Sequence, residues 1–134
     1  MEQIKFIFNP ISFLLVSTIL GCSQVNNNPT DCSEFKTGEF TFSEKSDVRI
    51  IRKDGIQKEY STANSVFIDE YQIEWTSPCS YKLWLVKTNQ SKGLDFSDTD
   101  TLFVEITSTA PKGYTYKAAK NGEIFEGQML VVKD

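Results

Sequence analysis

The sequence predicts an all-β fold, an antiparallel up-and-down meander of about eight strands forming a small barrel. Three observations lead to this prediction. From Gly38 onward, apolar and polar residues alternate in successive runs, which is typical of strands with one buried face. The dipeptides Asp54-Gly55 and Asn121-Gly122, which favour tight hairpin turns, separate some of these runs. No helical pattern longer than a turn interrupts them.

The first strands follow from local patterns. In the stretch GEFTFSE, Phe40 and Phe42 alternate with polar residues and predict a strand. Asp54-Gly55 favours positive φ angles, so Val48–Lys53 and Ile56–Tyr60 are expected to pair as a hairpin.

A single helical turn is expected just before the first strand, within Asp31–Thr37. Asp31 suits the N-cap, Glu34 follows three residues later, and Gly38 stands just past the end.

The same alternation continues to the end of the chain. Turns are expected at Ser77-Pro78, at Pro111-Lys112-Gly113 and at Asn121-Gly122, and the polar segment 89–100 predicts an exposed loop. Gly127 indicates a β-bulge in the last strand. These residues are expected to lie on one side of their strands: Tyr71, Ile73 and Trp75, then Cys79, Tyr81, Leu83 and Leu85, then Leu102, Val104 and Ile106, then Tyr114, Tyr116 and Ala118, then Phe125, Met129 and Val131.

Closure of the meander into a barrel would bury one face and remove the exposed strand edges. A half-open barrel or a two-sheet sandwich is the alternative. The aromatic residues are expected to fill the interior, and the alternative is that they line a pocket for an apolar molecule. They are Phe40, Phe42, Tyr71, Trp75, Tyr81, Tyr114 and Tyr116.

An apolar run in segment 1–21 ends at a cysteine. Its uninterrupted part, Ile11–Leu20, falls well short of the ~20 residues of a membrane-spanning helix and has the length of a signal-peptide core. Ile19-Leu20-Gly21-Cys22 resembles the lipobox of bacterial lipoproteins. The resemblance implies cleavage after Gly21 and attachment of fatty acyl chains such as palmitate to Cys22. The alternative is an ordinary secretory signal peptide, with Cys22 an unmodified thiol.

The remaining cysteines and the charge narrow the class further. Cys32 and Cys79 are an even pair in an exported chain and predict a disulfide; free thiols or half of a metal site are the alternatives. The chain has no histidine, which argues against zinc, and no cofactor is expected. The net charge of −4 argues against nucleic acid as a partner.

Two stretches together resemble short lipoproteins of Bacteroidota, especially flavobacteria. They are CSEFKTGEF (Cys32 to Phe40) and IEWTSPCSYKL (Ile73 to Leu83). Some members of that group carry the label DNA topoisomerase IV, an activity that a short acidic chain has no room for. Gly38-Glu39-Phe40 after a helical turn is also similar to the Gly-x-Trp start of lipocalins, with Phe in place of Trp. The lipocalin likeness implies a barrel that carries a small apolar ligand.

The resemblance gives an expected location. Surface-exported lipoproteins of Bacteroidota tend to carry acidic residues after the lipidated cysteine, and Ser23–Asn26 has none. We therefore expect an outer-membrane lipoprotein facing the periplasm. Residues 22–30 would form the lipidated cysteine and flexible tether, and residues 31–134 the barrel domain.

Few residues point to catalysis. Without histidine, neither a Ser-His nor a Cys-His pair exists, so a non-catalytic domain is expected. Glu70 and Glu74 are expected to be surface carboxylates rather than a glycosidase pair. For Asp95, Asp98 and Asp100, a solvated loop is expected and a calcium site is the alternative.

The expected function is binding of a protein partner, with carriage of a small apolar ligand as the alternative and an enzyme as the least favoured. Arg49 and Arg52 are expected at the surface or rim; the alternative is that one points into the barrel to hold an anionic group. Trp84 faces away from Tyr81 and is expected in an exposed contact patch. Trp75 is a further candidate contact for a ligand or partner.

Overall fold

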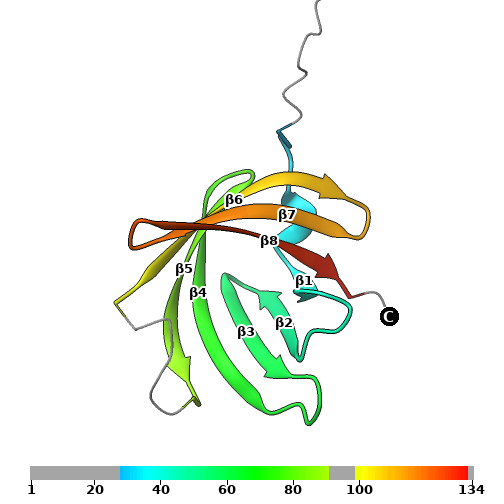
Figure 1. Ribbon diagram of the computed structural model, residues 1–134, viewed down its shortest axis with the longest axis vertical. Helices are drawn as coiled ribbons and strands as arrows, with labels where there is room; N and C mark the ends of the chain where they lie inside the picture. Colours follow the sequence, from blue (N-terminus) through cyan, green and yellow to red (C-terminus); the bar gives the residue numbers. More distant parts are fainter. Residues whose placement is uncertain (1–27, 91–98, 133–134) are drawn as a thin grey trace, which may run out of the picture.

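The computed structural model describes residues 28–90 and 99–132 of the chain. A short 3-10 helix, η1, precedes eight antiparallel strands that follow one another around a closed barrel (Figure 1). The predicted meander is confirmed, and the barrel is closed rather than half-open, because β1 pairs with β8. The elements are η1 (Ser33–Phe35), β1 (Gly38–Thr41), β2 (Val48–Lys53), β3 (Ile56–Ser61), β4 (Phe67–Ser77), β5 (Ser80–Thr88), β6 (Thr101–Ala110), β7 (Gly113–Lys120) and β8 (Glu123–Val131).

Both predicted hairpin dipeptides form the turns that were expected of them. Asp54 and Gly55 have φ angles of 53° and 75°, and Asn121 and Gly122 have 52° and 84°. Two successive positive φ angles match the twist of the flanking strands, which is why Asx-Gly pairs favour this position. They fix the β2–β3 and β7–β8 registers, and with them the residues that face inward.

The antiparallel order gives the barrel two distinct ends. The β2–β3, β4–β5 and β6–β7 turns lie at the end where β1 begins, together with η1, and we call this the closed end. The β1–β2, β3–β4 and β7–β8 connections lie at the opposite, open end. In Figure 1 the described chain begins at the top of the barrel, and η1 is seen behind β7.

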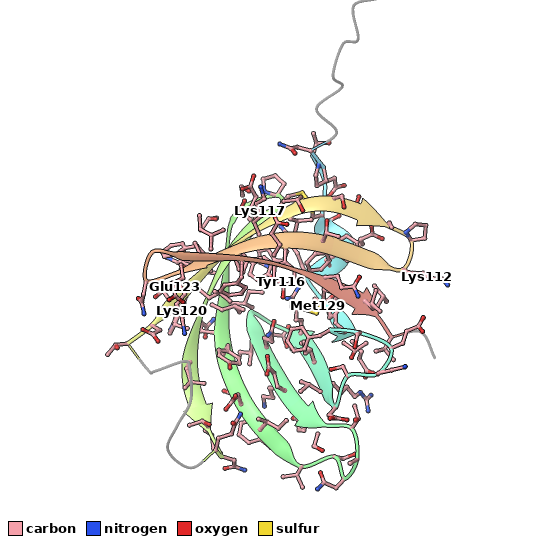
Figure 2. All side chains as sticks on the ribbon, in the orientation of Figure 1. Lys112, Tyr116, Lys117, Lys120, Glu123 and Met129 are labelled. Atoms are coloured by element: carbon pink, nitrogen blue, oxygen red, sulfur yellow. A yellow bond between two sulfur atoms is a disulfide. The ribbon has the colours of Figure 1, made fainter. Side chains whose placement is uncertain are left out.

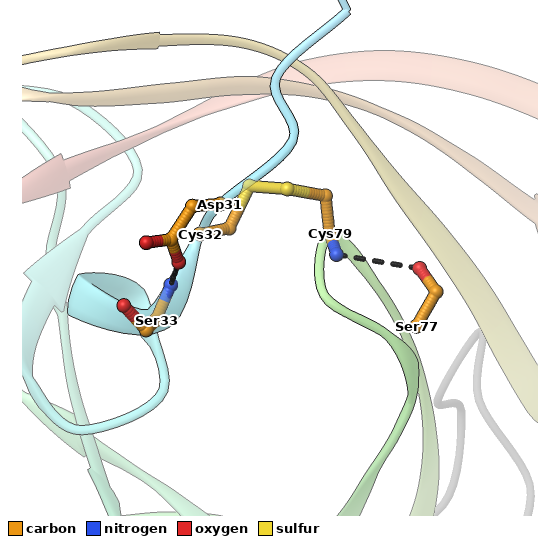
Figure 3. The surroundings of a disulfide bond; sticks show 5 residues. All are labelled: Asp31, Cys32, Ser33, Ser77 and Cys79. Carbon is orange, nitrogen blue, oxygen red and sulfur yellow. Dashed lines mark hydrogen bonds between the residues drawn. A yellow bond between two sulfur atoms is a disulfide. The ribbon is translucent and has the colours of Figure 1, made fainter.

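A disulfide between Cys32 and Cys79 fastens η1 to the β4–β5 turn at the closed end (Figure 3). The backbone N–H of Cys79 donates to Ser77 Oγ, and that of Ser33 donates to Asp31 Oδ1. Phe35 is buried, and its ring lies 4.9 Å from that of Tyr114. The predicted disulfide is therefore present, and η1 plugs this end of the barrel.

Three local predictions need correction. Cys32, not Asp31, occupies the N-cap of η1, because the helix begins only at Ser33. β1 ends at Thr41, so Phe42 lies past the strand and is 36% exposed. Gly127 pairs with Tyr116 in a continuous β7–β8 register without a bulge. A Cβ at Gly127 would lie 2.5 Å from the Tyr116 hydroxyl, so close packing explains this glycine.

Some predictions fall outside the described residues. They are the signal peptide 1–21, Cys22, most of the tether 22–30, and Asp95 and Asp98 of the polar loop. Within the described ranges, no helix is long and apolar enough to cross a membrane.

Candidate functional site: a cavity inside the barrel

A cavity of about 210 Å³ lies inside the barrel and reaches Phe42 and Phe125, which are exposed at the open end. The expectation of a filled interior is thus wrong in this half of the barrel. The inward positions of β3 hold the polar residues Gln57 and Glu59 instead of large apolar ones, and Gly127 adds no side chain. The lining is Phe42, Arg52, Gln57, Glu59, Tyr71, Tyr81, Leu83, Leu102, Val104, Tyr116, Phe125 and Met129.

Arg52 forms the floor of the cavity and is only 1% exposed. Its Nε donates to Gln57 Oε1 at 2.8 Å, Nη1 to the Phe35 carbonyl at 3.2 Å, and Nη2 to the Tyr81 hydroxyl at 2.9 Å. The guanidinium carbon lies 4.8 Å from the centre of the Tyr81 ring and 5.0 Å from that of Phe40. The expected surface or rim position of Arg52 is therefore wrong: polar acceptors and aromatic rings stabilise the buried cation.

Glu59 stands on the cavity wall, one inward position beyond Gln57 on β3. Gln57 joins it to Arg52, because Gln57 Nε2 donates to Glu59 Oε1 at 3.0 Å. Glu59 is half-buried, and this burial, reinforced by the nearby Asp69 carboxylate, raises the pKa of its carboxyl to about 7. The wall of the cavity therefore carries a carboxyl group that changes charge near neutral pH.

Asp69 lies beside Glu59 on the neighbouring strand and is 3% exposed. Its Oδ2 accepts hydrogen bonds from the Tyr71 hydroxyl at 3.2 Å and from Gln90 Nε2 at 3.0 Å. Its Oδ1 is buried without a hydrogen-bond partner in the described part of the chain. The interior near the open end thus holds a second carboxylate with unused acceptor capacity.

Tyrosine hydroxyls line the rest of the polar wall. Tyr116 on β7 and Met129 on β8 lie on the inner side of their strands (Figure 2). Burial raises the pKa of the Tyr71 and Tyr116 hydroxyls above the usual value, so both are neutral donors at physiological pH. The Tyr81 and Tyr114 hydroxyls bond to each other at 2.9 Å near Arg52.

The other predicted contact residues lie outside the cavity. Arg49 is exposed and pairs with Glu39 on the outer surface. Trp75 packs on Tyr81, with ring centres 4.8 Å apart. Trp84 is half-buried on the outer face, as expected from the alternation, with Lys82 Nζ 5.8 Å from its ring.

The predicted carboxylate candidates do not form a site among the described residues. Glu70 pairs with Lys58 and Glu74 with Lys82 on the outer surface. Asp100 accepts a hydrogen bond from Asn121 Nδ2. Residues 28–90 and 99–132 hold no group of three or more potential metal ligands.

Sequence reasoning missed Gln57, Glu59 and Asp69 as interior residues. Gln57 and Glu59 alternate with outward-facing Lys58 on a strand whose partner is fixed by Asp54-Gly55. That register places Gln57 opposite Arg52, which was the available signal. An alternating pattern made of polar residues alone does not tell which face is inward.

Comparison of the chain with protein-family models, with curated proteins and with solved structures gives no match.

Proposed function

We propose that this protein is a non-catalytic lipoprotein of the bacterial cell envelope that binds a small, largely apolar molecule inside its barrel. The sequence alone favoured binding of a protein partner, with carriage of a small apolar ligand as the alternative. The cavity favours the ligand carrier. The observation that carries it is the cavity of about 210 Å³. A dry cavity of about 150 Å³ is known to admit a benzene-sized molecule, so this one has room for a small ligand.

The character of the cavity wall supports the proposal. Leu83, Leu102, Val104 and Met129 supply apolar contact, and a few polar groups are placed among them. An apolar hollow with a small number of directed polar groups is the usual make-up of a small-molecule site. The cavity reaches the exposed residues Phe42 and Phe125 at the open end, so a ligand would enter from that end.

The position of the proposed tether agrees with this role. The described chain enters through Cys32 at the closed end, whereas Phe42 and Phe125 belong to the open end. A lipid on Cys22 would therefore hold the barrel by its closed end. A ligand would reach the cavity from the side opposite the anchor.

The test compares two substitutions on neighbouring positions of β6. Leu102 lines the cavity, and Phe103 is 57% exposed on the outer face. The full chain would be purified from membranes and analysed by native mass spectrometry for a retained non-covalent molecule. We expect the wild type and Phe103→Trp to retain it and Leu102→Trp, which fills the cavity, to lose it. Equal retention by Leu102→Trp would count against the proposal, and the same spectra report the acyl mass on Cys22.

A protein partner is the second candidate function, favoured by an apolar strip on the outer face of β6–β8. Phe103, Ala119 and Ile124 lie side by side across three strands, and Phe103 and Ile124 are 57% and 73% exposed. Apolar patches of this kind often mark contact surfaces. A photo-crosslinking residue at position 103, compared with one at exposed Glu44, would report a specific adduct if a partner covers the strip.

A further inference from the structure

Glu59 and Asp69 bring two carboxyl groups together inside the barrel. They are paired residues across the β3–β4 ladder, and none of the ion pairs among the described residues includes either one. Arg52 is the nearby buried cation, but Gln57 lies between its guanidinium and Glu59. The three guanidinium nitrogens already donate to Gln57, Phe35 and Tyr81.

The two carboxyl groups also have unused acceptor capacity. Asp69 Oδ1 is buried without a partner in the part of the chain that the structure describes. The one hydrogen bond to Glu59 comes from Gln57 and reaches Oε1, again among described residues. Buried acceptors lacking donors are unfavourable, and a donor supplied from outside would relieve that cost. Asp69 is 3% exposed, so its carboxyl group is already held away from water and a bound donor need not desolvate it again.

Several aromatic rings line the same cavity as Glu59. Phe42, Tyr71, Tyr81, Tyr116 and Phe125 all line the cavity. The face of an aromatic ring attracts a cation, and the attraction is strongest where water is excluded. Carboxylates combined with several ring faces form the usual surroundings of a bound organic ammonium group.

We propose that the ligand of this cavity carries an ammonium group on a small apolar body, with the ammonium against Glu59 on the side of Asp69. This inference depends on the proposed function, since it names the class of molecule that the cavity takes. The apolar body packs on Leu83, Leu102 and Val104. An anionic ligand would be repelled by the Glu59 and Asp69 carboxylates. A neutral ligand would gain no charge–charge attraction from them.

Three probes of nearly equal size and different charge test the inference: phenethylammonium, phenethyl alcohol and hydrocinnamate. Each is titrated calorimetrically into the full chain, purified from membranes and held in nanodiscs of zwitterionic lipid, with empty discs as the blank. The titrations run above the pKa of Glu59. We expect phenethylammonium to bind at least about tenfold more tightly than the alcohol, and hydrocinnamate to bind most weakly.

Two isosteric variants locate the preference. Glu59→Gln is expected to remove most of the advantage of phenethylammonium over the alcohol. Glu70→Gln, on the outer face of β4 next to Asp69, is the matched control and is expected to keep it. Binding of the alcohol as tight as that of the amine, tighter binding of hydrocinnamate, or an amine preference that persists in Glu59→Gln would overturn the ammonium inference and leave the cavity as a binding site. Failure of all three probes to bind the folded protein would overturn both proposals.

Discussion

Arg52 and Tyr81 contact each other in two ways inside the barrel. The Arg52 Nη2 donates to the Tyr81 hydroxyl at 2.9 Å, and the guanidinium carbon lies 4.8 Å from the centre of the Tyr81 ring. Because Arg52 comes from β2 and Tyr81 from β5, the pair ties together two strands that are not neighbours. The polar contact thus replaces apolar packing at the centre of the closed end.

The first prediction concerns this buried cation. Arg52→Ala would leave Gln57, Tyr81 and the Phe35 carbonyl without their donor and open a void, so we expect a loss of about 3 kcal/mol in the free energy of unfolding. Arg49→Ala is the control on the same strand, where an exposed pair with Glu39 contributes less than ~1 kcal/mol. Urea denaturation measures both, and equal losses would contradict the structural role of Arg52.

The second prediction concerns the pH dependence of stability. The pKa of Glu59 is raised from 4.5 to about 7, so the unfolded chain ionises this group first as pH rises. Folding therefore loses stability between about pH 4.5 and 7 and then levels off, a loss on the order of 3 kcal/mol. The hydrogen bond from Gln57 and the charge of Arg52 lower the pKa of Glu59, and the charge of Asp69 raises it. Glu59 in turn raises the pKa of Tyr71 and of Tyr116.

Glu59→Gln isolates that contribution. Thermal unfolding followed by circular dichroism should show a midpoint that falls less steeply over this range in Glu59→Gln than in the wild type. Glu123→Gln, on the exposed end of β8, is the control and should keep the wild-type slope. Parallel curves for the wild type and Glu59→Gln would show that Glu59 is not the titrating group.

The third prediction concerns the disulfide. Cys32 and Cys79 are 47 positions apart, and closing a loop of this length stabilises the folded state by roughly 4 kcal/mol. The Cys32→Ser/Cys79→Ser variant should lose about that much in chemical denaturation. A reducing agent should lower the stability of the wild type and leave the double variant unchanged. If full reduction of the disulfide left the free energy of unfolding of the wild type unchanged, the disulfide would not stabilise the fold as assigned.

The fourth prediction concerns Gly127 and Tyr116. A Cβ at position 127 would lie 2.5 Å from the Tyr116 hydroxyl and 2.6 Å from its Cζ, so Gly127→Ala forces the ring to move. We expect this substitution to cost about 2 kcal/mol of unfolding free energy. In a Tyr116→Leu background the same change should cost much less, and this difference in a double-mutant cycle is the measurement. Equal costs in both backgrounds would mean that the loss of stability does not come from contact with the Tyr116 ring, and would point instead to the strand backbone.

Much of the fold was predictable because the local sequence patterns all indicated the same antiparallel meander. Alternation identified the strands, and Asp54-Gly55 and Asn121-Gly122 set their pairing. The cavity was not predictable in this way. Its floor and wall come from Arg52, Gln57 and Glu59, polar residues that a sequence pattern assigns to the outside until pairing shows which face is inward. Whether the aromatic rings at the open end fill the interior also depends on the diameter of the barrel and on the end of β1 at Thr41. The sequence pattern predicted neither of these.

The link between Cys32 and Cys79 would also have a mechanical consequence under the proposed N-terminal anchor. β1 meets β8 through two residue pairs, Phe40 with Val131 and Thr41 with Leu130, so tension applied to β1 would unzip the barrel at that seam. The covalent bond passes the load to the β4–β5 hairpin before it reaches β1, and that hairpin is held by eight residue pairs. A pull from the N-terminal side would then be borne by β4 and β5, and the pairing of β1 with β8 would stay intact.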